Sequence, residues 1–142
     1  MDLPEAHRVA PGRHAIHATA VSCSGRGLLI LGPSGSGKSS VAAQMIALGA
    51  TLVSDDRVEI LEDGRLAPPP GASALIELRG LGLVACPVAP APFSASLLLA
   101  APTARLPEPE TLDLAGHRVP LLRHAAAPDL GAKLTLWLRA LP

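Results

Sequence analysis

Residues 32–39 read GPSGSGKS and match the pattern G-x-x-x-x-G-K-[ST] in full. Glycines in such a loop let backbone N–H groups turn inward on a phosphate without a clash from a Cβ atom. Lys38 then reaches the terminal phosphates, and the Ser39 hydroxyl is placed to bind Mg²⁺. One of the chain's two lysines stands here. We therefore expect this Walker A loop to bind ATP and Mg²⁺ through Gly32, Ser34, Gly35, Ser36, Gly37, Lys38, Ser39 and Ser40.

A loop of this kind works only between a strand and a helix, and the flanking residues predict both. Residues 27–31, GLLIL, form a short continuous apolar run, which is typical of a strand covered on both faces. Residues 38–48 have a helical pattern in which Val41, Met45 and Leu48 share one face, and Gly49 is a C-terminal stop. The helix N-terminus then adds its partial positive charge to the phosphate site.

A pair of acids follows the next predicted strand. Asp55 and Asp56 come directly after the buried run TLVS, 17 and 18 residues beyond Lys38. Acids at the end of a strand beside a phosphate loop can hold Mg²⁺ or accept a proton from an attacking group. Adjacent side chains point in different directions along an extended backbone. The pair therefore predicts two different roles.

The rest of the chain predicts mostly strands. We expect residues 1–13 to be a loose lead-in and residues 14–23 to form one strand that ends at the turn Ser24-Gly25. Residues 57–68 and 111–122 read as hairpins with turns at Asp63-Gly64 and Ala115-Gly116, and residues 93–102 as a buried strand. A closing helix, capped by Asp129, presents one apolar face made of Leu130, Leu134, Trp137, Leu138 and Leu141. One helix inside a run of strands predicts an α/β fold with a mixed sheet.

Composition narrows the class of protein. The 142 residues predict a single domain, and 49% hydrophobic against 17% charged residues is typical of a globular chain. Formal net charge is zero and the aromatic residues are Phe93 and Trp137, which argues against nucleic-acid binding. No apolar run approaches the roughly 18 residues of a membrane span. Cys23 and Cys86 lie far apart without metal-ligand spacing, so we expect buried free thiols in a cytoplasmic protein.

Three motifs in order resemble one family. Residues 32–60, GPSGSGKSSVAAQMIALGATLVSDDRVEI, resemble the catalytic core of HPr kinase/phosphorylase, with its segment G-x-x-L-V-x-D-D at residues 49–56. Residues 76–85, IELRGLGLVA, resemble the family signature LEIRGLGII. The family also places a histidine in a strand fifteen residues before the first loop glycine, where His17 stands. Residues 105–122 resemble the tail of short, single-domain relatives from α-proteobacteria.

The resemblance implies a cytoplasmic serine kinase that uses ATP and Mg²⁺ to phosphorylate the phosphocarrier protein HPr in phosphotransferase-system regulation. It implies a fold similar to that of phosphoenolpyruvate carboxykinases. Carried over residue by residue, it makes Asp55 the base, places His17 and Lys38 at the transfer centre, and lets Arg79 steady phosphate charge. It gives metal binding to three residues: Ser39, Asp56 and Glu77.

The sequence also departs from the family pattern. It has no counterpart of the N-terminal regulatory domain, and residues 85–92, ACPVAPAP, do not match the family's P-V-R-P-G-R-N segment. Ala85 replaces the usual acid after the signature. Phosphorylase activity and a homo-oligomeric state therefore stay open. Two other functions stay open as well: a kinase for another acceptor, and a non-catalytic ATP sensor. The retained acid pair argues against the sensor, which needs no base.

Overall fold

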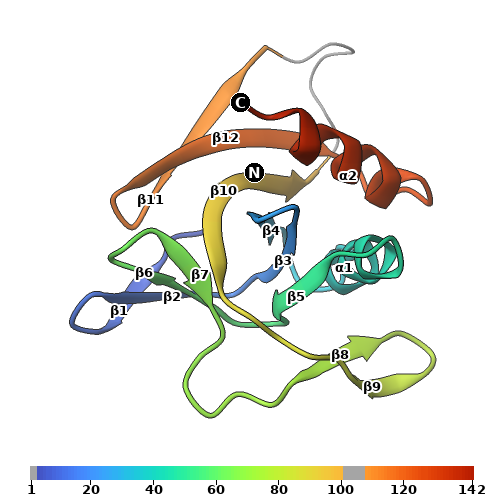
Figure 1. The fold of residues 1–142 in the computed structure, drawn as a ribbon, viewed down its shortest axis with the longest axis horizontal. Helices are drawn as coiled ribbons and strands as arrows, with labels where there is room; N and C mark the ends of the chain where they lie inside the picture. The colour runs from blue at the N-terminus through green and yellow to red at the C-terminus, as the bar shows by residue number, and fades with distance from the viewer. Residues whose placement is uncertain (1–2, 101–107) are drawn as a thin grey trace.

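The computed structural model describes residues 3–100 and 108–142. A ten-stranded mixed sheet and two helices make up most of it, with a separate two-stranded hairpin at one end (Figure 1). This confirms the predicted α/β fold with a mixed sheet. The strands of the large sheet are β1 His7–Ala10, β2 Arg13–Ile16, β3 Thr19–Cys23, β4 Arg26–Leu31, β5 Thr51–Ser54, β6 Val58–Leu61, β7 Arg65–Ala67, β10 Ala91–Leu99, β11 Glu110–Leu114 and β12 His117–His124. The helices are α1 Lys38–Ala47 and α2 Leu130–Ala140, and the hairpin is β8 Leu75–Leu78 with β9 Gly82–Ala85.

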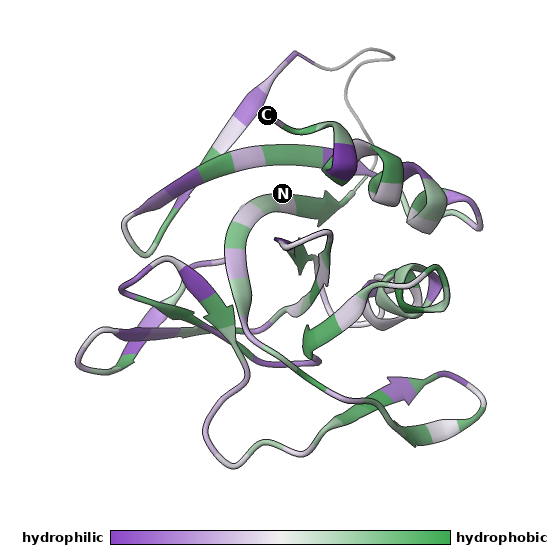
Figure 2. Ribbon diagram, in the orientation of Figure 1, coloured by the Kyte–Doolittle hydropathy of each residue, from purple (hydrophilic) through white to green (hydrophobic). Residues whose placement is uncertain are grey.

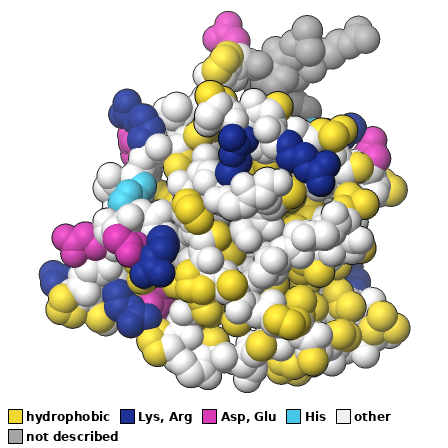
Figure 3. Space-filling model, viewed as in Figure 1, with side chains coloured by type: hydrophobic (Ala, Val, Ile, Leu, Met, Phe, Trp, Pro, Cys, Tyr) yellow, Lys and Arg dark blue, Asp and Glu magenta, His cyan; other side chains and the backbone are white. Residues whose placement is uncertain are grey.

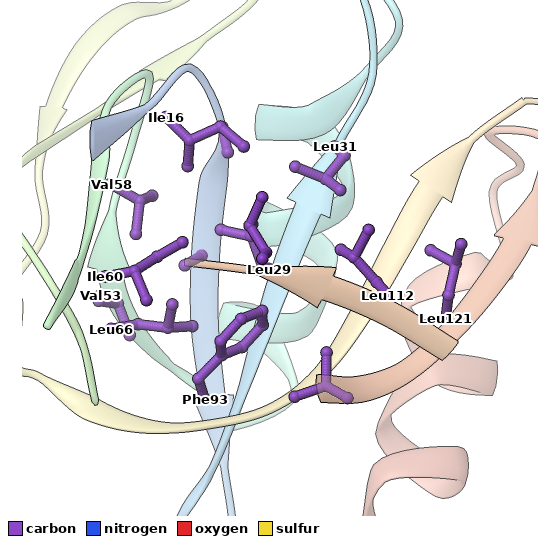
Figure 4. Packing of buried hydrophobic residues seen from close by; sticks show 14 of the residues in the cluster. Ile16, Leu29, Leu31, Val53, Val58, Ile60, Leu66, Phe93, Leu112 and Leu121 are labelled. Atoms are coloured by element: carbon purple, nitrogen blue, oxygen red, sulfur yellow. The ribbon is translucent and has the colours of Figure 1, made fainter. Parts of the chain in front are cut away.

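Strand β4, which leads into the phosphate loop, is buried on both faces as predicted. Leu28 and Ile30 belong to a cluster that the two helices cover, whereas Leu29 and Leu31 belong to a second cluster between strands. In Figure 4, Leu29 and Leu31 lie among other apolar side chains of this second cluster, including Phe93. Packing on both sides holds the end of β4 in place, and with it the start of the loop.

Strand β10 connects the parts of the sheet. Its first residues pair antiparallel with β7, its middle pairs parallel with β4, and Ser96–Leu99 pair parallel with β12. The strand bends along its length (Figure 1). These two parallel pairings make the sheet mixed. The predicted strand at residues 93–102 is confirmed as far as Leu99, and residues 101 and 102 lie outside the description.

The N-terminal part differs from the sequence prediction. Residues 7–10 are not a loose lead-in: they form β1, which pairs antiparallel with β2. The single strand expected at residues 14–23 is two strands, because the chain leaves its pairing with β6 at Ile16 and joins β4 and β5 from Thr19. An alternating pattern cannot show this change of partner, because side chains alternate in both strands.

The helices agree with the prediction except at their ends. Leu130, Leu134 and Leu138 of α2 are buried, and Trp137 and Leu141 pack against the same cluster. In α1, Val41 and Met45 are buried, but Leu48 is 52% exposed because the helix has already ended at Ala47.

The predicted cap of α2 is only partly correct. Asp129 takes the N-cap position, yet its carboxylate makes no capping hydrogen bond to the described residues. It pairs instead with Lys133, one turn further along, at 3.3 Å. The helix is therefore held by its contacts with α1, where the backbone N–H of Gly131 donates to Gln44 Oε1 at 2.7 Å.

The β8–β9 hairpin lies outside the large sheet. Colouring by hydropathy shows apolar residues in the hairpin as well as in the central strands (Figure 2). Both cysteines are free thiols, but Cys86, which follows the hairpin, is partly exposed, so the expected burial holds for Cys23 alone. Across residues 3–100 and 108–142, neither helix is long and apolar enough to span a membrane.

Candidate active site

A cavity of about 350 Å³ opens where the phosphate loop, the end of β5 and the start of the β8–β9 hairpin meet. Most of the residues expected at the site from the sequence line it. Gly32 and Ser36 do not line it, and Thr19, which was not expected, does. The full lining consists of His17, Thr19, Ser34, Gly35, Gly37, Lys38, Ser39, Ser40, Asp55, Asp56, Glu77 and Arg79.

Lys38 forms hydrogen bonds within the phosphate loop. The Lys38 side chain is buried, and Nζ donates to the carbonyl oxygens of Gly32 at 2.9 Å and Pro33 at 3.1 Å. Burial lowers the pKa of Lys38, and the nearby charges of Asp56 and Asp55 oppose that shift. A bound triphosphate would offer this ammonium oxygens with full negative charge in place of two carbonyl dipoles.

Gly32 and Ser36 lie close together within the loop. A Cβ atom on Gly32 would lie 2.5 Å from Ser36 Oγ, so only glycine fits there. Ser36 Oγ is itself buried and, within the described residues, has no hydrogen-bond partner. The Ser36 side chain does not line the cavity, so any phosphate contact from this residue would come from its backbone.

Asp55 is bound on both carboxylate oxygens. Thr19 Oγ1 donates to Oδ1 at 2.9 Å, and Ser39 Oγ donates to the same oxygen at 2.8 Å. The backbone N–H of Glu77 donates to Oδ2 at 3.1 Å. Asp55 thereby connects β3, the start of α1 and β8. It lies beside the one hydroxyl that loop chemistry assigns to a metal ion.

These oxygen donors fit Mg²⁺. Ser39 and Asp55 are in direct contact, and the Glu77 side chain lines the same cavity. Among the residues that the structure covers, no group of three or more His, Cys, Asp or Glu side chains is arranged to hold a metal ion by itself. In nucleotide sites one or two side chains share Mg²⁺ with phosphates and water, and the adjacent Ser39 and Asp55 oxygens fit that arrangement.

Asp56 differs from Asp55 in exposure and in the direction of its side chain. Its side chain is 82% exposed, and Oδ1 lies 3.3 Å from Nδ1 of His17. The backbone is left-handed at Asp56 (φ 71°), and the N–H of Arg57 donates to the carbonyl of Asp55 at 2.8 Å, closing a three-residue turn. Backbone strain of this kind concentrates at functional sites. Here it turns the two carboxylates in different directions.

The two acids differ in their contacts and in their exposure. A base needs a carboxylate oxygen that an incoming hydroxyl can approach; Asp56 is exposed and lines the cavity, whereas both oxygens of Asp55 already accept hydrogen bonds. His17 differs from expectation, because it lies in the break between β2 and β3 and not in a strand. The backbone N–H of Ala18 donates to the carbonyl of Asp56 at 3.3 Å and ties this break to the acid turn.

Thr19 is the site residue that sequence reasoning missed. It is 1% exposed, and a buried hydroxyl needs a hydrogen-bond partner. A threonine inside the apolar stretch ATAV, two residues after His17, is a signal that could have identified it. Glu77 and Arg79, which were expected, reach the cavity from β8 and its turn, and both are exposed.

Comparison with known proteins finds relatives for the part of the chain that contains the loop, the acid pair and the hairpin. Residues 8–88 match the family model described as HPr Serine kinase C-terminal domain. The HPr kinase/phosphorylase of Lacticaseibacillus casei (strain BL23) is 40% identical over 76 residues, which is 51% of this chain and 24% of that protein. The HPr kinase/phosphorylase of Clostridium tetani (strain Massachusetts / E88) is 43% identical over 75 residues, 51% of this chain and 25% of that protein. The aligned segment thus spans about a quarter of the length of these curated relatives.

A solved structure shares the fold. The structure of the Hpr(Ser) kinase/phosphatase from Coxiella burnetii superimposes with a TM-score of 0.76 and covers 88% of each chain. Sequence identity over this superposition is 23%. The match therefore extends the fold likeness beyond residue 88, into the part of the chain that the family model does not reach.

Proposed function

Because the chain belongs to the family of the HPr serine kinase C-terminal domain, we propose that it is a kinase that transfers phosphate from Mg·ATP to a serine of the phosphocarrier protein HPr. The observation that carries the proposal is the exposed Asp56, which faces the same cavity as the phosphate loop and lies beside His17. A donor site and a free carboxylate in one cavity are the two parts that phosphoryl transfer to a hydroxyl needs.

The donor half is the loop with its lysine. Backbone N–H groups of residues 34–39 and Lys38 hold the β- and γ-phosphates. Mg²⁺, when bound, neutralises charge on these phosphates. Ser39 contributes its hydroxyl to the ion, and Asp55 supports the ion and its waters from the position it already takes against Ser39. Glu77 adds a further carboxylate at the edge of the metal site, and Arg79 meets phosphate charge from the hairpin turn.

The acceptor half is Asp56. A serine hydroxyl that approaches the γ-phosphorus gives its proton to Asp56 as the new O–P bond forms and the bond to the leaving ADP oxygen breaks. His17 orients the Asp56 carboxylate through the contact at 3.3 Å. This reverses the roles suggested by the resemblance: Asp55 belongs to the metal side, and Asp56 is the base.

We further propose that residues 1–142 form one catalytic domain of a cytoplasmic enzyme. Its two apolar clusters share the strand that leads into the loop, which supports a single folding unit. The acid pair supports a kinase over an ATP sensor, since binding alone leaves Asp56 without a task.

Phosphotransfer to HPr tests the proposal. The protein is incubated with γ-labelled ATP, Mg²⁺ and HPr, and the labelled residue is mapped by mass spectrometry. We expect phosphoserine, and we expect Asp56→Asn to lower the rate by a factor on the order of 10²–10⁴ while nucleotide binding remains. Asp63→Asn is the matched control, because Asp63 is an exposed acid in the β6–β7 turn.

Two outcomes would contradict parts of the proposal. Tight binding of Mg·ATP without transfer to HPr would favour another acceptor or a sensor. A normal transfer rate in Asp56→Asn would exclude this residue as the base.

A further inference from the structure

A second cavity, of about 310 Å³, adjoins the first one. The two share Asp55, Asp56 and Glu77, but the second has no wall from the phosphate loop. Its other walls come from Arg57, the turn at residues 69–73, and the hairpin residues Leu75 and Leu83. A molecule in this second cavity would therefore reach Asp56 without displacing the nucleotide. We call it the acceptor groove.

The apolar wall of the acceptor groove is exposed. Glu77 pairs with Leu83 across the β8–β9 hairpin, so both side chains stand on the same face, toward the groove. Ile76, on the other face of the hairpin, is 4% exposed and packs in the cluster that the two helices cover. Leu83 is 69% exposed and Leu81, in the turn of the hairpin, is 79% exposed. Figure 3 shows apolar side chains gathered on the surface at this end of the molecule.

The exposed side of the hairpin indicates that something covers it during function. β8 is anchored through the buried Ile76, whereas every residue of β9 is exposed. Contiguous apolar surface beside a polar site marks an interaction site on soluble proteins. The position of the surface, continuous with the cavity that holds the proposed base, indicates which interaction it serves.

We propose that the acceptor groove binds the polypeptide segment that carries the target serine, and that Leu75 and Leu83 receive an aliphatic side chain next to that serine. The inference rests on the proposed kinase function and adds the determinant of acceptor choice. A polypeptide fits better than a small-molecule alcohol. A small molecule in the groove leaves Leu81, which lines neither cavity, in water, whereas a folded acceptor can cover Leu81 as well as Leu83.

The test compares two exposed leucines. Leu83→Ser removes the apolar wall, and Leu136→Ser is the matched control, because Leu136 on α2 is 66% exposed and lines neither cavity. With HPr as acceptor, we expect Leu83→Ser to raise KM for HPr about tenfold, which corresponds to about 1.4 kcal/mol of binding free energy. The KM for ATP and kcat at saturating HPr should stay at the wild-type values. Leu83→Met, which conserves volume and polarity, should keep the wild-type KM.

The outcomes separate this inference from the function on which it rests. If the wild type phosphorylates HPr and Leu83→Ser has the same KM as Leu136→Ser, the acceptor groove is wrong and the kinase proposal stands. If the wild type does not phosphorylate HPr, the kinase proposal fails, and the groove fails with it as an HPr site. If sedimentation shows that Leu83→Ser converts an oligomer into a monomer, the apolar wall is a self-association surface, which also overturns the inference.

Discussion

Replacing Asp55 by asparagine should destabilise the protein even without ligands, because Asp55 holds three parts of the site together. Thr19, Ser39 and the backbone N–H of Glu77 all donate to its carboxylate. An asparagine oxygen can still accept the two hydroxyl bonds, but as neutral bonds of roughly half the strength. Its amide group then meets the N–H of Glu77, so one donor faces another.

The size of the effect follows from these three contacts. Hydrogen bonds to charged groups contribute about 1.5–3 kcal/mol and neutral ones about 0.5–1.5 kcal/mol. The two weakened bonds together lose about 2–3 kcal/mol and the lost bond about 1.5–3 kcal/mol, while no longer partly burying a charge returns about 1.5–3 kcal/mol, so the free energy of unfolding falls by about 2–3 kcal/mol. At about 3 °C per kcal/mol for a domain of this size, the midpoint of thermal unfolding falls by roughly 6–9 °C.

Asp56→Asn is the matched control for this prediction. The Asp56 side chain is 82% exposed, and asparagine tolerates the left-handed backbone at this position, so its unfolding free energy should change by less than about 0.5 kcal/mol. Urea unfolding of the ligand-free variants measures both values, with the slope against urea checked for constancy. Equal stability of the two variants would refute the structural role assigned to Asp55. A large loss of unfolding free energy in Asp56→Asn would contradict the expectation that this exposed side chain contributes little to stability.

Three further predictions concern other parts of the chain. Gly131→Ala should lower the unfolding free energy by about 1–3 kcal/mol in urea, because its Cβ would lie 2.4 Å from Gln44 Cβ, although alanine is the better helix former. Mg·ATP at a hundred times its Kd should stabilise the wild type by about 2.7 kcal/mol in thermal unfolding, and Lys38→Ala or EDTA should abolish most of that gain. The hydrogen bond from Arg118 lowers the pKa of the exposed Asp113, so its contribution to stability is complete above the ordinary value of 3.8 and is lost as the pH falls below it. Asp113→Asn and high salt should each weaken the fall in the thermal unfolding midpoint at acid pH. An unchanged pH dependence would contradict the role of the Arg118–Asp113 pair.

The sequence by itself determined the elements whose signals are local. The apolar run of β4, the glycines of the loop and the start of α1 are contiguous, so their order predicts a phosphate site without knowledge of the fold. The turns at Asp63-Gly64 and Ala115-Gly116 are confirmed for the same reason, since turn residues and strand alternation lie within a few positions of each other.

Only the tertiary structure decided which groups contact the two acids. The donors that occupy Asp55 lie 16, 22 and 36 residues away from it along the chain, so no spacing rule connects them. The direction of Asp56 depends on a left-handed turn that its residue type permits but does not require. The acceptor groove likewise exists only because the hairpin at residues 75–85 lies beside the end of β5. The phosphate loop could therefore be predicted from the sequence, whereas the different contacts of Asp55 and Asp56 depend on segments that are distant along the chain.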